Sequence, residues 1–299
     1  INKNSTAAKD NLIIDDIVFY EKTQPYFQIL NHNSKPLSEY YAQASNLTGK
    51  ELVEELRIII STNLNSIRYQ DIKTILEFAD KSLEDETKVI GIYDRRLLKA
   101  NWGTKSEWHR EHVWPNSRLG MPRVKESEVN QGSDPHNLRA IYPSTNSSRS
   151  NRYFDNSQIN VLGHTISSDR YYPGDEDKGD VARILMYMAV RYDFLGLTNH
   201  VELLNQKAYT KEAAYMGLLD VLLDWHLEDP VDDFERQRNE VIYQYQNNRN
   251  PFIDHPELFM EVYTYLLSVD NKRIVKNLII TNYDIDYSLF KRNNNYKVA

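Results

Sequence analysis

Cysteine is absent from this chain of 299 residues, and so is any run of eighteen consecutive apolar residues. Without cysteine there is neither a disulfide framework nor a thiolate metal site. Without a long apolar run, no segment is predicted to cross a membrane as a helix. The hydrophobic fraction of 40% is ordinary, so the chain can bury the core of one large domain or two small ones. Metal binding and catalysis therefore have to rely on nitrogen and oxygen side chains.

A positive net charge is also missing. The formal charge is −7, which argues at first sight against a nucleic-acid partner. The distribution of charge changes that conclusion, because residues 95–152 contain eleven Lys and Arg against five Asp and Glu, which leaves −13 on the remainder. The local field rather than the net charge steers a polyanion, so this segment favours a nucleic-acid partner. The alternative interpretation is an ordinary solvated basic face.

No signal peptide is visible, and the first residue is Ile1 rather than Met, which is typical of a processed start. Residues 1–37 are Asn-rich without periodicity, and we expect a lead-in that is extended or in part disordered. Helical spacing of apolar residues predicts helices over residues 37–60, 69–78, 180–192, 212–226, 234–246 and 257–267, the third with Asp180 as its N-cap. Residues 89–93 are predicted to form a short strand. No repeat or linker interrupts residues 38–299, so we expect one mostly helical α+β domain there.

The segment Glu107–Ser117 (EWHREHVWPNS) is the most informative part of the chain, because it places the carboxylate of Glu111 beside the imidazole of His112. Two further polar segments follow, Ser133–Leu138 (SDPHNL) and Ser144–Arg152 (STNSSRSNR). Carboxylate and amide oxygens are hard ligands that suit Mg²⁺ or Ca²⁺. An imidazole can deprotonate water near neutral pH, and guanidinium groups can hold phosphate oxygens. Together these groups suit the hydrolysis of a phosphodiester.

The motifs E-H-V-W-P, S-D-P-H-N-L and N-S-S-R-S-N-R-Y-F, in this order and spacing, resemble the endonuclease I family of bacterial secreted nucleases, which carry a ββα-metal (His-Me) finger. Segments within residues 178–192 and 234–252, and upstream residues 40–41 and 49–52, fit the same family. The resemblance covers roughly residues 38–260 and places the finger at about 105–155. The chain has a β-like context at His112, a second β-like run over 137–142, and a turn with a helix N-cap at 143–145. This is the strand, loop, strand and helix order that such a finger requires.

The resemblance implies that His112 is the general base and that Glu111 and Asn146 hold one divalent ion, Mg²⁺ first, with Mn²⁺ or Ca²⁺ as alternatives. It also implies that the carbonyl of Gly132 holds the other ring nitrogen of His112. A nuclease of this kind would cut DNA and RNA with little sequence preference, without using the ribose 2′-hydroxyl, and would leave 5′-phosphate products. We expect a secreted or cell-surface monomer without a membrane span.

Further residues complete the predicted site: Arg118 and Arg149 as catalytic arginines, Arg110, Arg123 and Arg152 as substrate-binding residues, and Asp134, His136 and Asn151 as supporting residues. Several of these assignments have an alternative. The arginine on the scissile phosphate is either Arg118 or Arg123, and Arg149 could instead pair with an acid, as could Arg152. Asp134 could be a turn residue and His136 a structural histidine. Trp108 and Trp114 are interpreted as core anchors, and the aspartates of residues 175–180 as an acidic loop and helix cap.

Two departures from the family pattern stand out, namely His109, where the family often has Asn, and Pro135, where it usually has an apolar, flexible residue. His109 creates a rival hypothesis, a zinc-dependent hydrolase that uses His109, His112 and one of Asp134 or His136. The order H-R-E-H differs from H-E-x-x-H, so the two-histidine helix of zinc proteases is not available to it. A second rival is a non-catalytic nucleic-acid-binding surface protein that keeps the finger only as a scaffold.

Overall fold

The computed structural model describes residues 37–103, 106–156, 160–161, 164–166, 169–204, 208–211 and 214–272. Residues 43–299 form one compact unit and residues 1–42 another. Of residues 1–42 the structure describes α2 (Leu37–Tyr40) and the two residues after it. The 3₁₀ turn η1 (Ala42–Ala44) begins at the last residue of this unit. The expectation of a partly disordered lead-in over residues 1–37 falls, apart from Leu37, outside the described residues.

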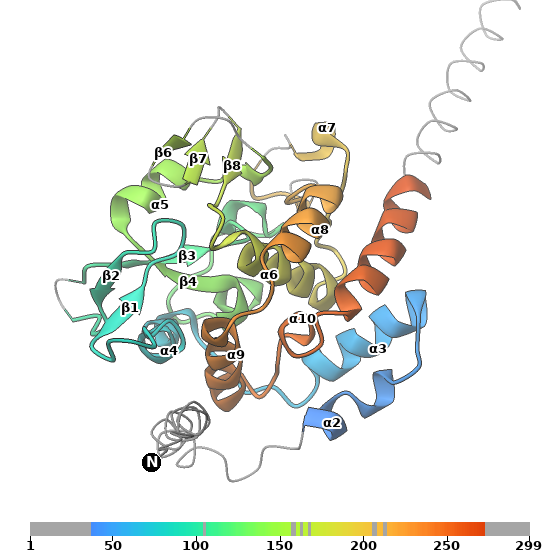
Figure 1. Ribbon diagram of the computed structural model, residues 1–299, viewed down its shortest axis with the longest axis horizontal. Helices are drawn as coiled ribbons and strands as arrows, with labels where there is room; N and C mark the ends of the chain where they lie inside the picture. Colours follow the sequence, from blue (N-terminus) through green and yellow to red (C-terminus); the bar gives the residue numbers. More distant parts are fainter. Residues whose placement is uncertain are drawn as a thin grey trace, which may run out of the picture. The chain divides into compact units, whose positions relative to one another are not determined.

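Helices dominate the larger unit (Figure 1). They are α3 (Gly49–Ser61), the turn η2 (Tyr69–Asp71) leading into α4 (Ile72–Ala79), α5 (Pro143–Arg149), α6 (Lys178–Arg191), α7 (Val201–Leu204), α8 (Leu219–Glu228), α9 (Asp233–Gln246), α10 (Pro251–Asp254) and a helical stretch over residues 258–272. The prediction of a mostly helical α+β fold is confirmed. No helix in the described ranges has the length and apolarity that a bilayer crossing requires.

Helix α6 is buried along its whole length except at its two end residues, and it packs against α3, α8 and α10. The prediction of its start was wrong by one turn, because the N-cap position is occupied by Asp177 and Asp180 lies inside the helix. Asp180 is almost fully buried there and pairs with Arg139 at 2.9 Å (Oδ2 to Nη1). Asp180 therefore pairs with an arginine instead of capping the helix, because a buried carboxylate requires a cationic partner.

Within the described ranges, three small sheets accompany the helices. Strands β1 (Lys88–Ile90) and β2 (Leu97–Lys99) form one antiparallel hairpin, and β3 (His109–His112) pairs antiparallel with β4 (Leu138–Ile141) in a second sheet. The third sheet has the order β5-β8-β7-β6, from Tyr153–Phe154, Arg170–Tyr172, His164–Ile166 and Asn160–Val161. The sequence did not predict this third sheet, because its strands are only two or three residues long and show no alternating pattern.

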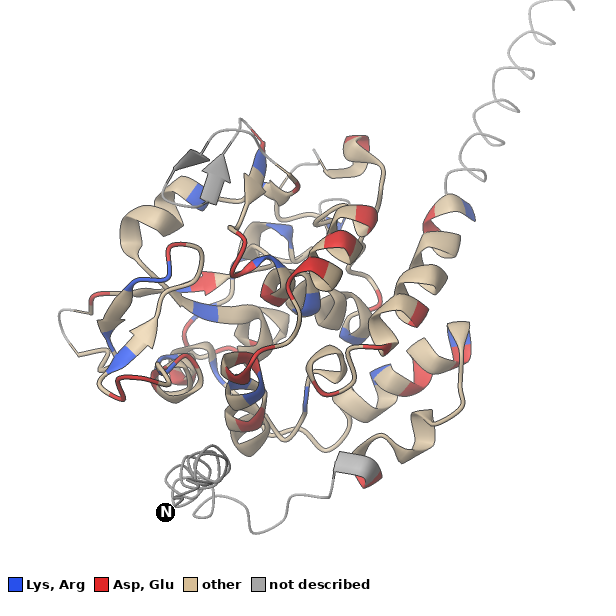
Figure 2. Ribbon diagram, in the orientation of Figure 1, with Lys and Arg blue, Asp and Glu red and all other residues tan. Residues whose placement is uncertain are grey.

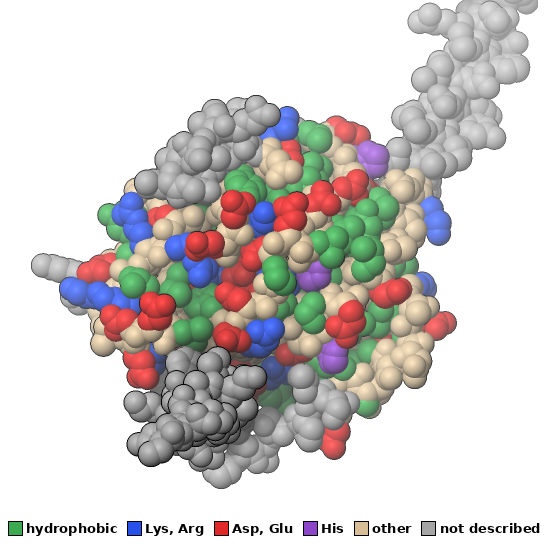
Figure 3. Space-filling model, viewed as in Figure 1, with side chains coloured by type: hydrophobic (Ala, Val, Ile, Leu, Met, Phe, Trp, Pro, Cys, Tyr) green, Lys and Arg blue, Asp and Glu red, His purple; other side chains and the backbone are tan. Residues whose placement is uncertain are grey.

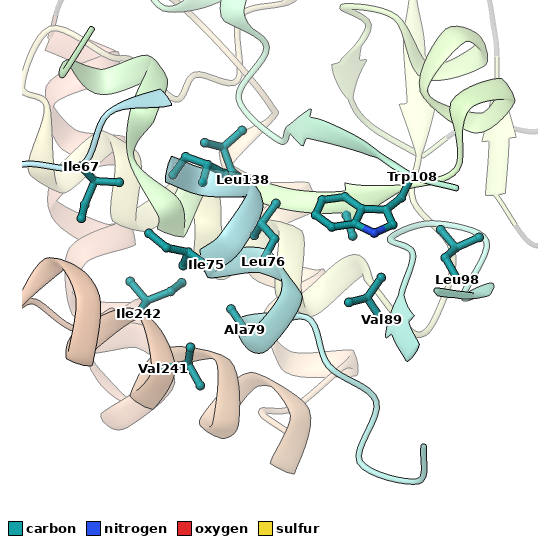
Figure 4. Close-up of a cluster of buried hydrophobic side chains, with 12 residues drawn as sticks. Ile67, Ile75, Leu76, Ala79, Val89, Leu98, Trp108, Leu138, Val241 and Ile242 are labelled. Carbon is teal, nitrogen blue, oxygen red and sulfur yellow. The ribbon is translucent and has the colours of Figure 1, made fainter. Parts of the chain in front are cut away.

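The core that holds the β3–β4 sheet in place lies between α4 and α9 (Figure 4). Ile75 and Leu76 of α4 face Val241 and Ile242 of α9, and Leu138 of β4 packs onto the same cluster. The helical spacing of apolar residues in α4 explains this arrangement, since it lines one side of the helix with aliphatic side chains. Strand β4 is thereby packed onto the layer formed by α4 and α9.

Charges of both signs are interspersed along the elements in Figure 2, and the face drawn in Figure 3 likewise mixes cationic with anionic side chains. Much of the positive excess of residues 95–152 is compensated inside the protein. Arg95 pairs with Asp177 at 2.9 Å, and Arg139 is fully buried between Asp80 and Asp180. The segment therefore contributes individual cationic groups to the site rather than a broad basic face.

Candidate active site

Strands β3 and β4 and helix α5 follow one another in the predicted order of strand, loop, strand and helix. In the ladder Glu111 lies opposite Arg139 and His112 opposite Leu138. Helix α5 starts at Pro143, a residue that suits the first helical position, and its N-cap is Tyr142, so the turn and N-cap predicted at 143–145 lie in the first turn of the helix. The hydroxyl of Thr145 donates to the carboxylate of Asp94, which ties α5 to the loop after β1.

Six of the eleven predicted site residues lie in the wall of a single cavity of about 420 Å³. The wall consists of Tyr69, Arg110, Glu111, His112, Pro115, Asn116, Ser117, Arg123, Asn146, Ser150, Asn151, Ala208 and Tyr209. Residues from β3, the loop after it, α5 and the segment 208–211 thus meet around one space. The volume is within the range of pockets that bind small organic molecules, about 300–1,000 Å³.

His112 is the most constrained of these side chains. It is 8% exposed, and its Nε2 lies 2.7 Å from the carbonyl oxygen of Gly132. A carbonyl can only accept, so Nε2 carries the hydrogen and Nδ1 keeps a lone pair. The ring also stacks on Tyr69, with 5.3 Å between the ring centroids. Burial lowers the pKa of His112 to about 4, so the imidazole is neutral at pH 7.

The carbonyl of Gly132 is held in a tight turn, η4 (Gln131–Ser133), which the side chain of Asn130 caps by accepting from Gly132 N at 2.9 Å. A Cβ at Gly132 would lie only 2.8 Å from the side chain of Val124, so a larger residue would push the turn away. The predicted contact between Gly132 and the ring of His112 is therefore present, and the local sequence explains why a glycine stands there.

Asp134 anchors the end of that turn. Its carboxylate accepts hydrogen bonds from Arg191 at 2.5 Å, Tyr187 at 3.1 Å, Tyr192 at 3.1 Å and Gln246 at 3.0 Å. Burial alone would raise the pKa of this carboxyl, but the guanidinium of Arg191 and the hydrogen bonds outweigh it and hold the pKa below its usual range. Helices α6 and α9 thus fix the segment that carries the Gly132 carbonyl, which is a supporting role.

His136 lies in the same buried layer and outside the cavity wall. Its Nε2 is 3.3 Å from the carbonyl oxygen of Asn248, and its ring packs on Tyr187. Burial lowers the pKa of His136 to about 4, so it is a neutral, hydrogen-bonded core residue. Trp108 and Trp114 are fully buried as well, in agreement with their interpretation as core anchors.

Glu111 is only 3% exposed and has two partners on the same oxygen. Oε1 accepts from the hydroxyl of Tyr93 at 2.9 Å and lies 3.2 Å from Nε of Arg149. Within the described part of the chain, Oε2 forms no hydrogen bond. Burial raises the pKa of Glu111 to about 7, although Arg149 and the Tyr93 hydroxyl both pull it down. Among the described residues, Oε1 is therefore held by two partners, whereas Oε2 is left for a ligand.

Arg149 is fully buried and does not line the cavity. Besides the ion pair with Glu111, it donates to the carbonyls of Val113 at 2.6 Å and Ser150 at 2.9 Å. Of the two interpretations left open by the sequence, pairing with an acid is what the structure contains. The geometry gives Arg149 the role of orienting Glu111 and offers it no path to a substrate phosphate.

Arg118 is likewise outside the cavity wall, although it was predicted to be catalytic. Its guanidinium donates to the carbonyls of Asn151 at 2.8 Å and Leu204 at 2.5 Å, and it is 7% exposed. Its guanidinium therefore links chain segments to one another. Arg123, the other candidate, lines the cavity, is exposed, and has no hydrogen bond or ion pair within the described residues.

The remaining predicted substrate-binding residues differ in their availability. Arg110 lines the cavity, but its guanidinium already pairs with Glu126 at 2.6 Å and donates to the carbonyl of Tyr69. Asn151 is in the wall and donates to the hydroxyl of Ser117 at 3.2 Å. Arg152 lies outside the wall and donates to the carbonyl of Ser148 at 2.5 Å.

Asn146 and Glu111 together offer oxygen ligands for a hard cation. Asn146 is half-buried in the cavity wall, and its side-chain amide forms no hydrogen bond within the described residues. A carboxylate oxygen and an amide oxygen that share a cavity and lack partners suit a divalent ion that keeps several waters, as Mg²⁺ does. The donor set fits the metal that the sequence predicted.

The zinc hypothesis has less geometric support. His109 is exposed, and it lies three residues from His112 on β3, so the two side chains point to opposite faces of the strand. His136 and Asp134 are engaged elsewhere. Within the described residues there is no group of three or more His, Cys, Asp or Glu that could hold a metal ion.

Sequence reasoning missed three aromatic residues of the site. Tyr69 stacks on His112, Tyr93 donates to Glu111, and Tyr209 lines the cavity. The only advance signal was the unusually high tyrosine content of 21 residues, which does not say which ones meet the catalytic motifs.

Comparison with known proteins shows the family of this chain. A family model described as Endonuclease I matches residues 48–257. The extracellular ribonucleases of Bacillus amyloliquefaciens and of Bacillus subtilis (strain 168) are each 40% identical to this chain over 231 residues, covering 75% of this chain and 78% of each relative. The chain therefore belongs to the endonuclease I family, as its motifs predicted. It is an enzyme of the nuclease class, and its substrate is a nucleic acid.

Proposed function

We propose that this nuclease is a metal-dependent endonuclease with little sequence preference, which hydrolyses DNA and RNA to 5′-phosphate products with His112 as general base. The observation that carries the proposal is the fixed imidazole of His112 beside two oxygen ligands in one cavity. Its Nε2 is held 2.7 Å from Gly132, so Nδ1 is the basic nitrogen. The order of β3, β4 and α5 along the chain supports a ββα-metal finger at this place.

In the proposed reaction, Nδ1 of His112 takes a proton from the attacking water, and the stack on Tyr69 keeps the ring in place. The low pKa of about 4 keeps the base unprotonated over the whole neutral range. Because water and not a ribose hydroxyl is the nucleophile, the 2′-OH has no role. Both DNA and RNA are therefore expected substrates, and the naming of both relatives as ribonucleases supports the RNA activity.

Glu111 and Asn146 would hold one divalent ion, with Mg²⁺ as the first candidate and Mn²⁺ or Ca²⁺ as alternatives. When bound, such an ion supplies positive charge that stabilises the negative charge developing on the phosphate oxygens. Arg149 and Tyr93 keep Oε1 of Glu111 in place, so that the second oxygen faces the ligand position in a fixed orientation. Positioning of this kind removes the need to reorganise the carboxylate during binding.

Arg123 is the residue we assign to the substrate phosphate, because it is exposed in the cavity wall and no described residue forms a hydrogen bond or ion pair with it. Contacts of guanidinium groups with phosphate carry no base information, which accounts for the expected weak sequence preference. We also propose that the active form is a monomer. The two relatives are named extracellular, and by analogy we propose secretion or a cell-surface location for this protein.

The test compares cleavage of end-labelled single-stranded DNA and RNA with and without metal. We expect excess EDTA to abolish cleavage and Mg²⁺ or Mn²⁺ to restore it, with products that carry a 5′-phosphate and can be ligated. His112→Ala should bind metal and substrate nearly normally but turn over about 10²–10⁴-fold more slowly, the usual contribution of a positioned base. His109→Ala is the matched control and should retain turnover.

Three outcomes would overturn the proposal. Undiminished cleavage by dialysed protein in excess chelator would exclude a metal-dependent mechanism. Cleavage at fixed sites on unrelated sequences would exclude the phosphate-based recognition. If His109→Ala were as inactive as His112→Ala and also lost tightly bound zinc, the zinc-dependent hydrolase would replace it.

A further inference from the structure

Tyr209 stands apart from the other aromatic residues of the site. It lines the cavity, is 46% exposed, and has no partner for its ring or hydroxyl within the described residues. The other aromatic side chain in the cavity wall, Tyr69, is already occupied by the ring of His112 and by the guanidinium of Arg110, 3.6 Å from its centroid. Trp108 and Trp114 are buried in the core. Tyr209 is therefore the free aromatic surface of the cavity in the described part of the chain.

The backbone at Tyr209 is fixed in an unusual conformation. Its φ is +63°, in the left-handed region that bulky side chains seldom adopt and that glycine or asparagine would occupy more easily. The conformation is held by a hydrogen bond of 2.6 Å from the Tyr209 amide to the carbonyl of Ser117, inside the segment that also carries Glu111 and His112. The next residues lie against Gly120, where a Cβ would be 3.5 Å from Cα of Lys211. The backbone that carries the ring is thus hydrogen-bonded directly to the segment of Glu111 and His112.

We propose that Tyr209 is a stacking platform for an unpaired nucleobase next to the scissile phosphate. This inference rests on the proposed function of the cavity. Arg123 and Tyr209 then bind the two chemical parts of one nucleotide, the phosphate and the base. Stacking on a tyrosine is tolerant of base identity because every base has a π face, so the platform is compatible with weak sequence preference.

The platform predicts a preference for single strands over duplexes. A base in a duplex must leave its own stack before it reaches Tyr209, and this costs a few kcal/mol. That cost is comparable with the gain from one base–aromatic stack, so a duplex obtains little net benefit from the platform. A single strand offers its bases without this cost.

The experiment uses a single-stranded, 5′-labelled oligothymidine with one tetrahydrofuran abasic residue in the middle, and cleavage at each linkage is resolved on a denaturing gel. In the wild-type enzyme with Mg²⁺, we expect cleavage next to the abasic residue to be roughly 5- to 100-fold slower than elsewhere, the loss of one stack converted at tenfold per 1.4 kcal/mol. Tyr209→Phe should retain this local minimum. In Tyr209→Asn all linkages should be cut slowly and evenly.

Two choices keep the test specific. Asparagine tolerates the backbone conformation at this position, so Tyr209→Asn should fold. Phe194→Ala is the matched control, because Phe194 is 45% exposed and lies outside the cavity wall, and it should give the wild-type pattern. Even cleavage through the abasic residue by the wild-type enzyme would refute the platform, as would an unchanged minimum in Tyr209→Asn. Either result with metal-dependent cleavage intact would leave the proposed function standing, whereas metal-independent cleavage would refute that function instead.

Discussion

Replacing Arg149 by methionine tests whether this arginine orients Glu111 or binds a substrate phosphate. Arg149 is fully buried, lies 3.2 Å from Glu111 and donates to the carbonyls of Val113 and Ser150. Removing one partner of a buried ion pair leaves an uncompensated charge and typically costs about 3–5 kcal/mol. At about 2–4 °C per kcal/mol for a chain of this size, Arg149→Met should lower the melting temperature by roughly 6–20 °C.

The pH dependence of this loss has a definite sign. Burial already raises the pKa of Glu111 to about 7, and Arg149 is the main group that pulls it down. In Arg149→Met the pKa rises further, so the carboxyl is already protonated at a higher pH than in the wild type, and the uncompensated buried charge disappears as the pH falls. The difference in unfolding free energy between wild type and variant should therefore be smaller at pH 6 than at pH 8, as measured by thermal or urea unfolding.

Arg123→Met is the matched comparison, because Arg123 is exposed in the cavity wall. A surface substitution away from internal contacts should change stability by no more than about 0.5 kcal/mol. It should instead weaken binding of a single-stranded oligonucleotide and reduce the slope of log affinity against log salt concentration by about 0.7, the share of one phosphate contact. Fluorescence anisotropy in EDTA at several salt concentrations measures this slope without cleavage.

The two variants together can refute the assignment. If Arg149→Met kept the wild-type melting temperature and reduced the salt slope, Arg149 would contact phosphate and the buried ion pair with Glu111 would be without consequence. If Arg123→Met left the slope unchanged, the cavity would have to hold phosphate by another group.

Three further predictions follow from the buried groups around the site. The proposed divalent ion would have to displace the proton that Glu111 holds below about pH 7, so the metal Kd from calorimetry should weaken between pH 7.5 and 5.5, by up to about tenfold per pH unit, and a flat Kd would contradict this. Asp134→Asn should destabilise the fold by about 3–5 kcal/mol, because it leaves Arg191 without its ion-pair partner. It should also lower turnover at an unchanged metal Kd, because the turn that holds Gly132 against His112 loosens. Full turnover in the folded variant would show that the turn does not depend on Asp134. His136→Ala should cost about 1–3 kcal/mol in unfolding free energy and little turnover, and loss of turnover without loss of stability would give that histidine a direct role.

Much of the site follows from short segments of sequence. Glu111 and His112 are neighbours on one strand, and Asn146 follows the next strand on a short helix, so continuous motifs placed the three groups in the right order. The helices that carry strong apolar periodicity were also predicted close to their observed positions. Their boundaries were less accurate, as at α8, which was expected from residue 212 and starts at Leu219. Local pattern determines such features because they depend on residues a few positions apart.

The sequence by itself determined the family, the helical character, and the neighbourhood of Glu111 and His112 on one strand. Only the tertiary structure decided which arginine lines the cavity and which is internal. Arg118, Arg123 and Arg149 are alike as sequence, but Arg118 reaches a carbonyl 86 residues away and Arg149 reaches Glu111, whereas Arg123 reaches the cavity. The same holds for Tyr93, whose hydroxyl reaches Glu111, and for Tyr209, whose backbone amide reaches the carbonyl of Ser117. Hydrogen bonds and burial are set by packing across the fold, and no local pattern specifies which polar groups will be compensated inside and which will be left for a ligand.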